Sequence, residues 1–304
     1  MIDSLDAATP WPAAIPRLLA QVGPRWHTDI ARYGNEVKAA YLPLQLAAPR
    51  EGCTLLADVR YGPDERHRLD VFTPAAARGA PVVMFVHGGA FVRGDKTINE
   101  GMYANVLHWF ARQGFIGINV EYRLAPQAPW PGGAQDVARA VAWTHEHCES
   151  WGGDPDRLFL VGHSAGGTHA ASYACDPALG HGGKHLRGLV LLSARLRVDV
   201  LPENPNAPGV RAYFGDDPGM YDARSPVTHA AASTVPVFIA FAEFENPLLD
   251  VYALEFALAT ATARRRAPRL LRMRGHNHVS LMAHFNTGEE MLGREIVDFC
   301  ATLT

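Results

Sequence analysis

The sequence has few cysteines, and their spacing narrows what the protein can be. Its 304 residues include only four, Cys53, Cys148, Cys175 and Cys300, which lie far apart and form no Cys-x-x-Cys pair. This pattern favours buried free thiols in a reducing compartment over a disulfide framework or a zinc site. We therefore expect a cytoplasmic protein.

The sequence also lacks an excess of basic residues and a long apolar run. Lys and Arg number 28 against 31 Asp and Glu, so the formal net charge is −3. Without a basic stripe, neither nucleic acid nor an anionic membrane surface is an expected partner. The acidic start Met1–Asp6 does not resemble a signal peptide, and no apolar stretch is long enough to cross a bilayer. A homodimer is left open as the assembly state.

Hydrophobic residues make up 48% of the chain, which is enough for a large core. Residues 1 to about 50 are predicted to be mostly helical. Alternating segments at Ala57–Tyr61 and Arg68–Phe72, separated by the turn residues Gly62–Asp64, then predict an antiparallel hairpin.

Beyond the hairpin, continuously apolar segments alternate with helical patterns such as Asp136–Trp143. Strands buried on both faces have this character, and their alternation with helices predicts an α/β fold. We expect a mainly parallel central sheet with helices on both faces and a ligand site at the carboxyl ends of the strands. The predicted strands are Pro81–Val86, Phe115–Val120, Leu158–Val161, Gly188–Leu192 and Val237–Phe241.

One stretch interrupts this alternation. Residues 196 to about 234 are rich in Pro, Asn, Asp and Gly and are too long for an ordinary crossover. We predict that they form loops and short helices over the ligand site. Residues 1–304 then make a single domain, with a small lid contributed by about 1–50 and 196–234.

A candidate nucleophile follows the predicted strand Leu158–Val161. The segment Gly162–Gly166 reads Gly-His-Ser-Ala-Gly and leads into a helical pattern over Thr168–Ala174. A serine in a strained strand-to-helix turn needs small residues two positions before and after it, and here both are glycine. Ser164 is therefore the predicted nucleophile.

A glycine-containing turn follows the predicted strand Pro81–Val86. Gly88 and Gly89 allow the backbone to approach a ligand closely, which acyl transfer requires for binding the tetrahedral oxyanion. We predict an oxyanion hole in the turn Gly88–Ala90, with the N–H groups of Gly89 and Ala90 as donors and Ala165 as a third.

With these motifs in view, the chain resembles the hormone-sensitive-lipase-like branch of the α/β hydrolases and also the related kynurenine formamidases. The residues that carry the resemblance are His87–Phe91, Glu121–Pro126 and Gly162–Gly167. It extends from about residue 57 to the C-terminus and is weak in the first 50 residues and the insertion. Many lipase-branch members have a third glycine where this chain has Ala90. The resemblance implies an α/β-hydrolase fold with the triad order Ser, acid, His.

The catalytic base should follow the last predicted strand, Arg269–Arg274. The next loop contains His276 and His278, and the resemblance favours His278 because an apolar residue, Val279, follows it. His276 is the alternative. We expect no metal to be bound by this pair, because no carboxylate or cysteine lies beside it at ligand spacing.

The acid should follow the strand that ends near Phe241, where three carboxylates are available. The lipase branch usually has Asp-Pro-Leu there, whereas this chain has Asn246. The formamidase-like pattern of an acid, a small polar residue and proline favours Glu245. Glu243 and Asp250 are the alternatives, although Asp250 falls where a helix should begin and could cap it.

Around the predicted triad, we place Phe91, His163 and Phe214 among the substrate contacts. Aromatic residues would crowd the site and restrict it to short or medium acyl chains. We expect Glu121–Arg123 and Asp136 to be structural, forming a polar network that supports the oxyanion turn.

These features predict a serine hydrolase that cleaves small-molecule carboxylic esters through a Ser-His-Glu triad, without a metal or organic cofactor. An arylformamidase or another amidase would use the same machinery on a different leaving group. Transfer of the acyl group to an alcohol is a further alternative. A non-catalytic binding protein on the same scaffold, as in plant gibberellin receptors, is disfavoured because both Ser164 and His278 are present.

Overall fold

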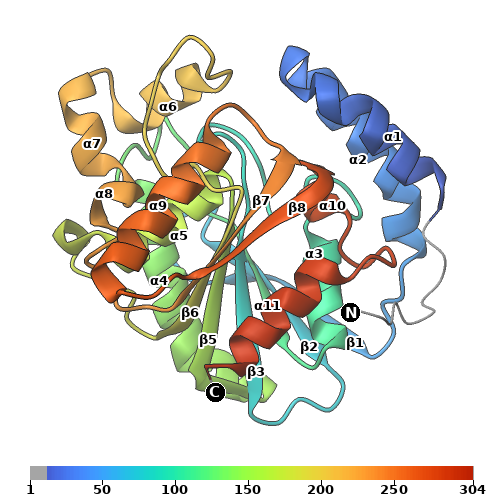
Figure 1. The fold of residues 1–304 in the computed structure, drawn as a ribbon. Coiled ribbons are helices and arrows are strands. Elements are labelled where there is room, and N and C mark those ends of the chain that lie inside the picture. The colour runs from blue at the N-terminus through green and yellow to red at the C-terminus, as the bar shows by residue number, and fades with distance from the viewer. Residues whose placement is uncertain (1–11, 304) are drawn as a thin grey trace.

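The computed structural model describes residues 12–303, and in these residues an eight-stranded sheet forms the centre (Figure 1). Its order is β1-β2-β4-β3-β5-β6-β7-β8. The predicted hairpin is confirmed, because β1 pairs antiparallel with β2, which in turn pairs antiparallel with β4; the remaining pairs are parallel. The strands are β1 Cys53–Arg60, β2 Arg68–Pro74, β3 Ala80–Val86, β4 Ile116–Val120, β5 Gly153–His163, β6 Leu186–Leu192, β7 Val237–Phe244 and β8 Arg269–Asn277.

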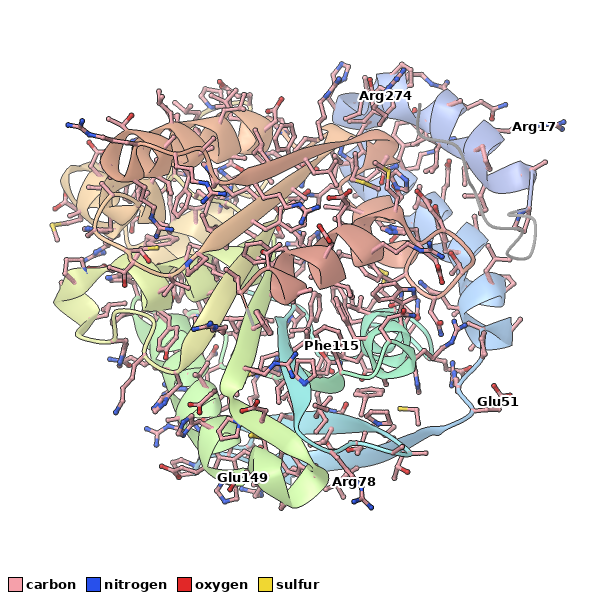
Figure 2. The ribbon with its side chains drawn as sticks, turned by 60° about the horizontal axis from the view of Figure 1, so that its bottom comes forward. Arg17, Glu51, Arg78, Phe115, Glu149 and Arg274 are labelled. Carbon is pink, nitrogen blue, oxygen red and sulfur yellow. The ribbon has the colours of Figure 1, made fainter. Side chains whose placement is uncertain are left out.

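Helices flank both faces of this sheet, and charged side chains such as Arg17, Glu51 and Arg78 lie at the exposed periphery (Figure 2). The α-helices are α1 Ala14–Val22, α2 Ile30–Ala47, α3 Ala104–Arg112, α4 Gly132–His147, α5 Ala165–Cys175, α6 Ala207–Phe214, α7 Tyr221–Arg224, α8 Pro226–His229, α9 Leu249–Arg264, α10 Ser280–Ala283 and α11 Met291–Ala301. The 3-10 helices are η1 Gly23–Thr28, η2 Cys148–Trp151, η3 Pro177–Leu179 and η4 Pro218–Met220.

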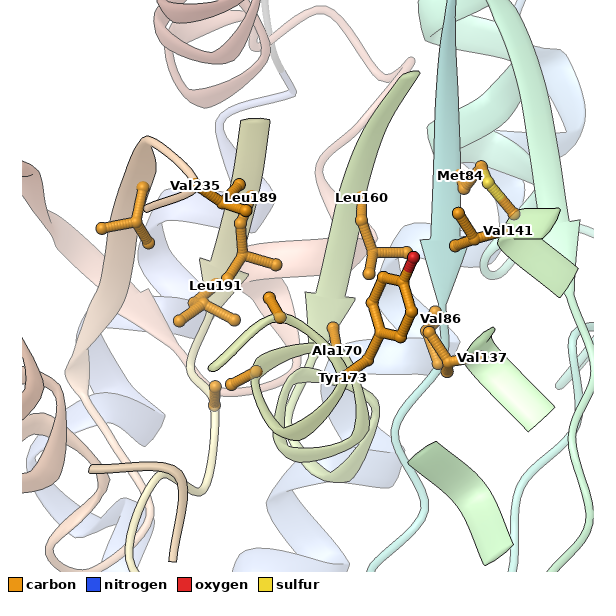
Figure 3. Close-up of a cluster of buried hydrophobic side chains, with 14 of the residues drawn as sticks. Met84, Val86, Val137, Val141, Leu160, Ala170, Tyr173, Leu189, Leu191 and Val235 are labelled. Carbon is orange, nitrogen blue, oxygen red and sulfur yellow. The ribbon is translucent and has the colours of Figure 1, made fainter. Parts of the chain in front are cut away.

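The core consists of two layers, because successive side chains of a strand point to opposite faces of the sheet. From β3, Met84 and Val86 pack with α4, α5 and α9, whereas Val83 and Phe85 pack with α3 and α11. Figure 3 shows the first layer, in which Leu160 of β5 lies beside Tyr173 of α5. The strands that carry the predicted site are therefore held rigidly from both sides.

Two segments outside the sheet lie over the carboxyl ends of its strands, and we call them the covering segments. The first is residues 12–47, which form α1, η1 and α2 at the upper right of Figure 1. The second is residues 196–234, which form α6, η4, α7 and α8 at the upper left and consist of loops and short helices, as predicted. The helical prediction for residues 1–11 lies outside the described residues.

None of the helices that the structure describes combines the length and the apolar character needed to span a membrane.

Candidate active site

Ser164 occupies the sharp turn between β5 and α5. Its φ and ψ are 54° and −120°, a conformation that L-residues rarely adopt. A Cβ on Gly166 would lie 2.2 Å from the Val86 carbonyl oxygen, and one on Gly162 would lie 2.6 Å from the Gly167 Cα. The two glycines therefore allow the backbone to pack closely enough to hold Ser164 in its strained turn.

The glycine turn after β3 lies directly against Ser164. A Cβ on Gly88 would lie 2.9 Å from the Ser164 Cβ, and one on Gly89 would lie 1.7 Å from the Arg93 carbonyl oxygen. Ala90 adopts a φ of 50° in this turn, which an alanine tolerates at some energetic cost.

The backbone N–H groups of Gly89, Ala90 and Ala165 donate to no acceptor among the residues that the structure describes. The Gly88 N–H, by contrast, hydrogen-bonds to the Tyr103 hydroxyl. Because Ala165 is the first residue of α5, its N–H also lies at the positive end of the helix dipole. These three free donors around Ser164 are suited to hold a negatively charged oxygen.

A buried polar network supports the glycine turn from below. His87 Nε2 lies 2.9 Å from Glu121 Oε1, and the Tyr122 hydroxyl donates to the His87 carbonyl oxygen at 2.8 Å. Burial alone would raise the pKa of Glu121, but His87, the Lys96 N–H and Arg66 together hold it below its usual value. Arg123 pairs with buried Asp136, so the structural roles predicted for Glu121–Arg123 and Asp136 agree with the contacts.

The loop after β8 presents His278 to the same cavity as Ser164. His278 Nδ1 lies 2.5 Å from Glu245 Oε1, and the Glu245 side chain is 3% exposed. A carboxylate at Nδ1 holds the imidazole in the tautomer that leaves Nε2 free to take up a proton. Among the described residues, the Ser164 hydroxyl makes no hydrogen bond, and Ser164 and His278 are related by the cavity that both line. Catalytic hydrogen bonds are often long before the substrate binds and tighten in the complex.

Several donors surround Glu245 and keep it ionised. Burial would raise the pKa of Glu245, but the neighbouring His278 and hydrogen bonds from Ser193 and the Asn246 N–H lower it below its usual value. The Ser193 hydroxyl donates to Oε2, and the Ala242 N–H donates to the same oxygen at 3.2 Å. Ser193 directly follows β6, a strand-end position where a sequence search could have found it.

The other candidate acids and the other candidate base lie elsewhere. Glu243 contacts Arg272 and the Gly275 N–H, and Asp250 accepts the Val251 N–H at the start of α9. His276 is directed away from the cavity, with Nδ1 beside the Ser280 hydroxyl and Nε2 beside Glu289.

Ser164 and His278 open onto one cavity of about 480 Å³, together with Gly88, Gly89 and Ala90. The covering segments form its outer wall, through Ile30 to Lys38 of the first and Pro205 and Asn206 of the second. Two other cavities, of about 510 and 830 Å³, are lined by none of the predicted site residues. The cavity at Ser164 is therefore identified as the candidate site by the residues that line it and not by its volume.

His163 also lines the cavity, but it is largely buried behind His278. Its Nε2 lies 3.2 Å from the His278 carbonyl oxygen, and the two rings are 4.8 Å apart. Burial lowers the pKa of His163 well below its usual value, so the ring is neutral and can pack against the catalytic loop.

The structure corrects the expectation that Phe91 and Phe214 contact the substrate. Both rings are fully buried, and neither lines the cavity. They pack edge to face at 5.2 Å in an aromatic cluster with Tyr213 and Trp130. Phe91 lies in the turn beyond β3 with a φ of 71°, and its ring packs inward. Trp26 and Tyr33 are likewise absent from the cavity lining.

Three residues could come together around a metal ion. The ligand atoms of His276, His284 and Glu289 lie within 4.8 Å of one another, so the fold brings a carboxylate beside His276 that the local sequence does not show. However, His276 Nε2 and Glu289 Oε1 are already in direct contact at 3.0 Å. As it stands, the three side chains form a largely buried polar cluster behind the loop of His278.

Comparisons with known proteins support the fold and the chemistry. The family described as BD-FAE has a model that matches residues 69–178, from β2 into η3. The chain is 26% identical to esterase LipQ of Mycobacterium tuberculosis, covering 78% of this chain and 61% of that protein. It is 26% identical to versiconal hemiacetal acetate esterase of Dothistroma septosporum, covering 83% of this chain and 81% of that protein.

The chain thus spans less than two thirds of the length of LipQ. It is 40% identical over 115 residues to esterase LipC of M. tuberculosis, and this match covers 37% of the chain and 28% of LipC. Among solved structures, it is similar to an esterase of Pyrobaculum calidifontis, with a TM-score of 0.70, 19% identity and coverage of 97% and 99% of the two chains. A bacterial heroin esterase gives a TM-score of 0.69 at 23% identity, covering 95% of this chain and 98% of that one. The chain therefore has the α/β-hydrolase fold, and its predicted resemblance to esterases of this fold is confirmed.

Proposed function

We propose that this protein hydrolyses carboxylic esters, with Ser164 as nucleophile, His278 as general base and Glu245 as the acid that orients His278. The observation that carries the proposal is the 2.5 Å contact between His278 Nδ1 and Glu245 Oε1, at a cavity that Ser164 shares. The esterase names of the relatives support the same reaction class.

In the first half of the reaction, Ser164 Oγ attacks the acyl carbon while His278 Nε2 takes the hydroxyl proton. The carbonyl oxygen becomes an oxyanion, which the N–H groups of Gly89, Ala90 and Ala165 stabilise. Glu245 stabilises the imidazolium that forms. His278 then returns the proton to the leaving alkoxide, and the acyl group remains bonded to Ser164. Water repeats the sequence on the acyl-enzyme and releases the acid.

The covering segments, residues 12–47 and 196–234, act in this proposal as a lid within one domain. This assignment is supported because both covering segments contribute walls to the cavity, whereas the catalytic side chains all come from strand ends. A volume of about 480 Å³ must hold both the acyl and the alcohol group, which favours short or medium acyl chains. Faster hydrolysis of laurate than butyrate esters would contradict this preference.

The test of the catalytic assignment combines labelling with turnover. A fluorophosphonate should modify the wild type on Ser164, as located by peptide mass spectrometry, and should not modify Ser164→Ala. On p-nitrophenyl butyrate, Ser164→Ala should lower kcat by about 10⁴-fold or more. A wild-type protein that neither reacts with the probe nor cleaves any activated ester would remove the enzyme proposal and leave a binding protein.

A formamide hydrolase is the second candidate, favoured by one observation. The acid that contacts His278 is a glutamate followed by Asn246 and Pro247, which is the formamidase-like pattern. Comparing kcat/KM for N-formylkynurenine and p-nitrophenyl butyrate separates the two, because each reaction uses the same triad with a different leaving group.

A further inference from the structure

The cavity beside Ser164 is lined by two cations and by no carboxylate in the part of the chain that the structure describes. Lys38 extends from α2 of the first covering segment, and Arg93 extends from the end of the glycine turn. Lys38 is half-buried and Arg93 is exposed. Neither forms an ion pair with a described carboxylate, although other cations near the site do. An uncompensated positive charge at the wall of a binding cavity points to a ligand of the opposite sign.

The nearest acids along the chain are engaged elsewhere. Glu36, two residues before Lys38, pairs with Arg32 at 2.8 Å. Asp95, two residues after Arg93, accepts the Thr97 N–H at 2.9 Å, and neither carboxylate lines the cavity. Partial burial and the neighbouring charge of Arg93 lower the pKa of Lys38, so the two cations repel each other across the cavity.

Arg93 is anchored at two points beside the cavity. Its backbone N–H donates to the Gly89 carbonyl oxygen at 3.0 Å, which ties it to the turn that supplies the oxyanion donors. One of its side-chain nitrogens donates to Asn206 Oδ1 at 3.1 Å, from the second covering segment. The other guanidinium donors are available, and a guanidinium can bind a carboxylate through two parallel hydrogen bonds.

We infer that the cavity binds esters whose acyl or alcohol group carries a carboxylate, with Lys38 and Arg93 as the residues that bind it. This inference rests on the proposed ester hydrolysis and deepens it by naming the substrate class. A neutral ester leaves both cations without a partner, whereas a carboxylate relieves their mutual repulsion and forms charge-assisted hydrogen bonds.

The test compares charged and neutral esters of matched size. On the acyl side, ethyl hydrogen glutarate is compared with its neutral amide analogue, ethyl glutaramate. On the alcohol side, 4-acetoxybutanoate is compared with 4-acetoxybutanamide. We expect a higher kcat/KM for the charged member of at least one pair, and this advantage should shrink as salt is added, because salt screens partly exposed charges. Which pair shows the advantage identifies the side of the ester that faces the cations.

Variants assign the effect to the two residues. Lys38→Met and Arg93→Met should each lower the charged-to-neutral ratio of kcat/KM by about tenfold, the loss expected for one charge-assisted contact. Lys38→Arg and Arg93→Lys, which keep the charge, should retain most of the ratio. Arg17→Met is the matched control, because Arg17 is an exposed cation of α1 at the periphery of the molecule and does not line the cavity (Figure 2). It should leave the ratio unchanged.

The outcomes separate this inference from the function on which it rests. If the neutral esters are cleaved and neither Met variant changes the ratio, the inference fails while ester hydrolysis stands. A Met variant that lowers turnover of charged and neutral esters equally also overturns it, since the cation would then act on the oxyanion or the fold. If no ester is cleaved, the proposed function fails, and calorimetry with Ser164→Ala decides the inference. Tighter binding of glutaramate than of glutaramide would support it, and equal binding would overturn it.

Discussion

The loops at the carboxyl ends of the strands and the covering segments contribute differently to the site. The strand ends supply every candidate catalytic group, and Glu245 among them is held in place by four hydrogen-bond contacts. The covering segments supply only cavity walls, through residues such as Lys38 and Asn206. The comparison indicates that the residues at the strand ends set the type of reaction, whereas the covering segments set the choice of substrate.

The largest difference should appear between two glutamates at the end of β7, Glu243 in the strand and Glu245 just after it. Glu245→Gln should lower kcat by about 10³- to 10⁴-fold, because an amide cannot stabilise the imidazolium and can hold the wrong His278 tautomer. Glu243→Gln is the matched control, since Glu243 contacts Arg272 and the Gly275 N–H rather than His278. Steady-state kinetics on p-nitrophenyl butyrate checks both, and equal losses in the two variants would remove Glu245 from its role.

The rigidity of the strands beneath these loops can be tested by making a cavity. Leu160 of β5 is fully buried beside α5, so Leu160→Ala should lower the free energy of unfolding by about 2–5 kcal/mol. Leu254→Ala on α9, where the side chain is 49% exposed, should change it by less than about 0.5 kcal/mol. Urea denaturation measures both. A loss at Leu160 no larger than at Leu254 would contradict the two-layer core.

Acid should lower the free energy of unfolding through three buried histidines. All three lie on helices packed against the sheet or in the turn after one, and none belongs to the covering segments. Burial lowers the pKa of His108 and His284 to about 4 and that of His169 to about 3, from an ordinary value of 6.5. At a pH between the ordinary and the lowered pKa, the unfolded chain binds more protons than the folded one. The free energy of unfolding therefore falls as pH falls from about 6.5 towards 4. Unfolding in urea at pH 7, 6 and 5 tests this.

The matched variant for the acid effect is His169→Asn, which removes one of the titrating rings. Its free energy of unfolding should depend less steeply on pH between 6 and 5 than that of the wild type. A wild-type stability that is constant from pH 7 to 5 would show that these rings are not held neutral by burial.

The smallest effect is expected where a covering segment meets a strand-end loop. Trp26 Nε1 donates to Asn246 Oδ1 at 2.9 Å, next to Glu245. Trp26→Phe should cost about 1 kcal/mol of stability, because it leaves a buried amide oxygen without its donor, and should change kcat by less than about threefold. Tyr33→Phe, in the same hydrophobic cluster, is the control. A tenfold loss of kcat in Trp26→Phe would mean that the covering segment takes part in positioning the acid.

Much of the site could be predicted because its signals are local. Ser164 is marked by glycines two positions away on each side, and the apolar pattern of β5 places it at a strand end. The choice between His276 and His278, and between Glu243 and Glu245, needed the family resemblance, because each pair is only two residues apart and hydrophobic periodicity does not separate its members. The direct contact of His278 with Glu245 agrees with both choices.

Other residues carried no local signal. Phe91 was expected among the aromatic residues that crowd the cavity, but its ring stacks on Tyr213 in the buried aromatic cluster. His276, His284 and Glu289 meet only because α10 and the following turn fold back on β8. Lys38 lies on a helix more than a hundred residues from Ser164 and reaches the cavity only through packing.

The sequence by itself determined the alternation of strands and helices, the strained turn at Ser164 and the glycine turn that faces it. These depend on steric and hydrophobic preferences that act over a few residues. Only the tertiary structure decided which carboxylate reaches His278, which aromatic rings leave the cavity and which cations remain without partners. Those outcomes depend on distances between segments far apart in the chain, which the pairing of the strands and the packing of the covering segments on the sheet establish together.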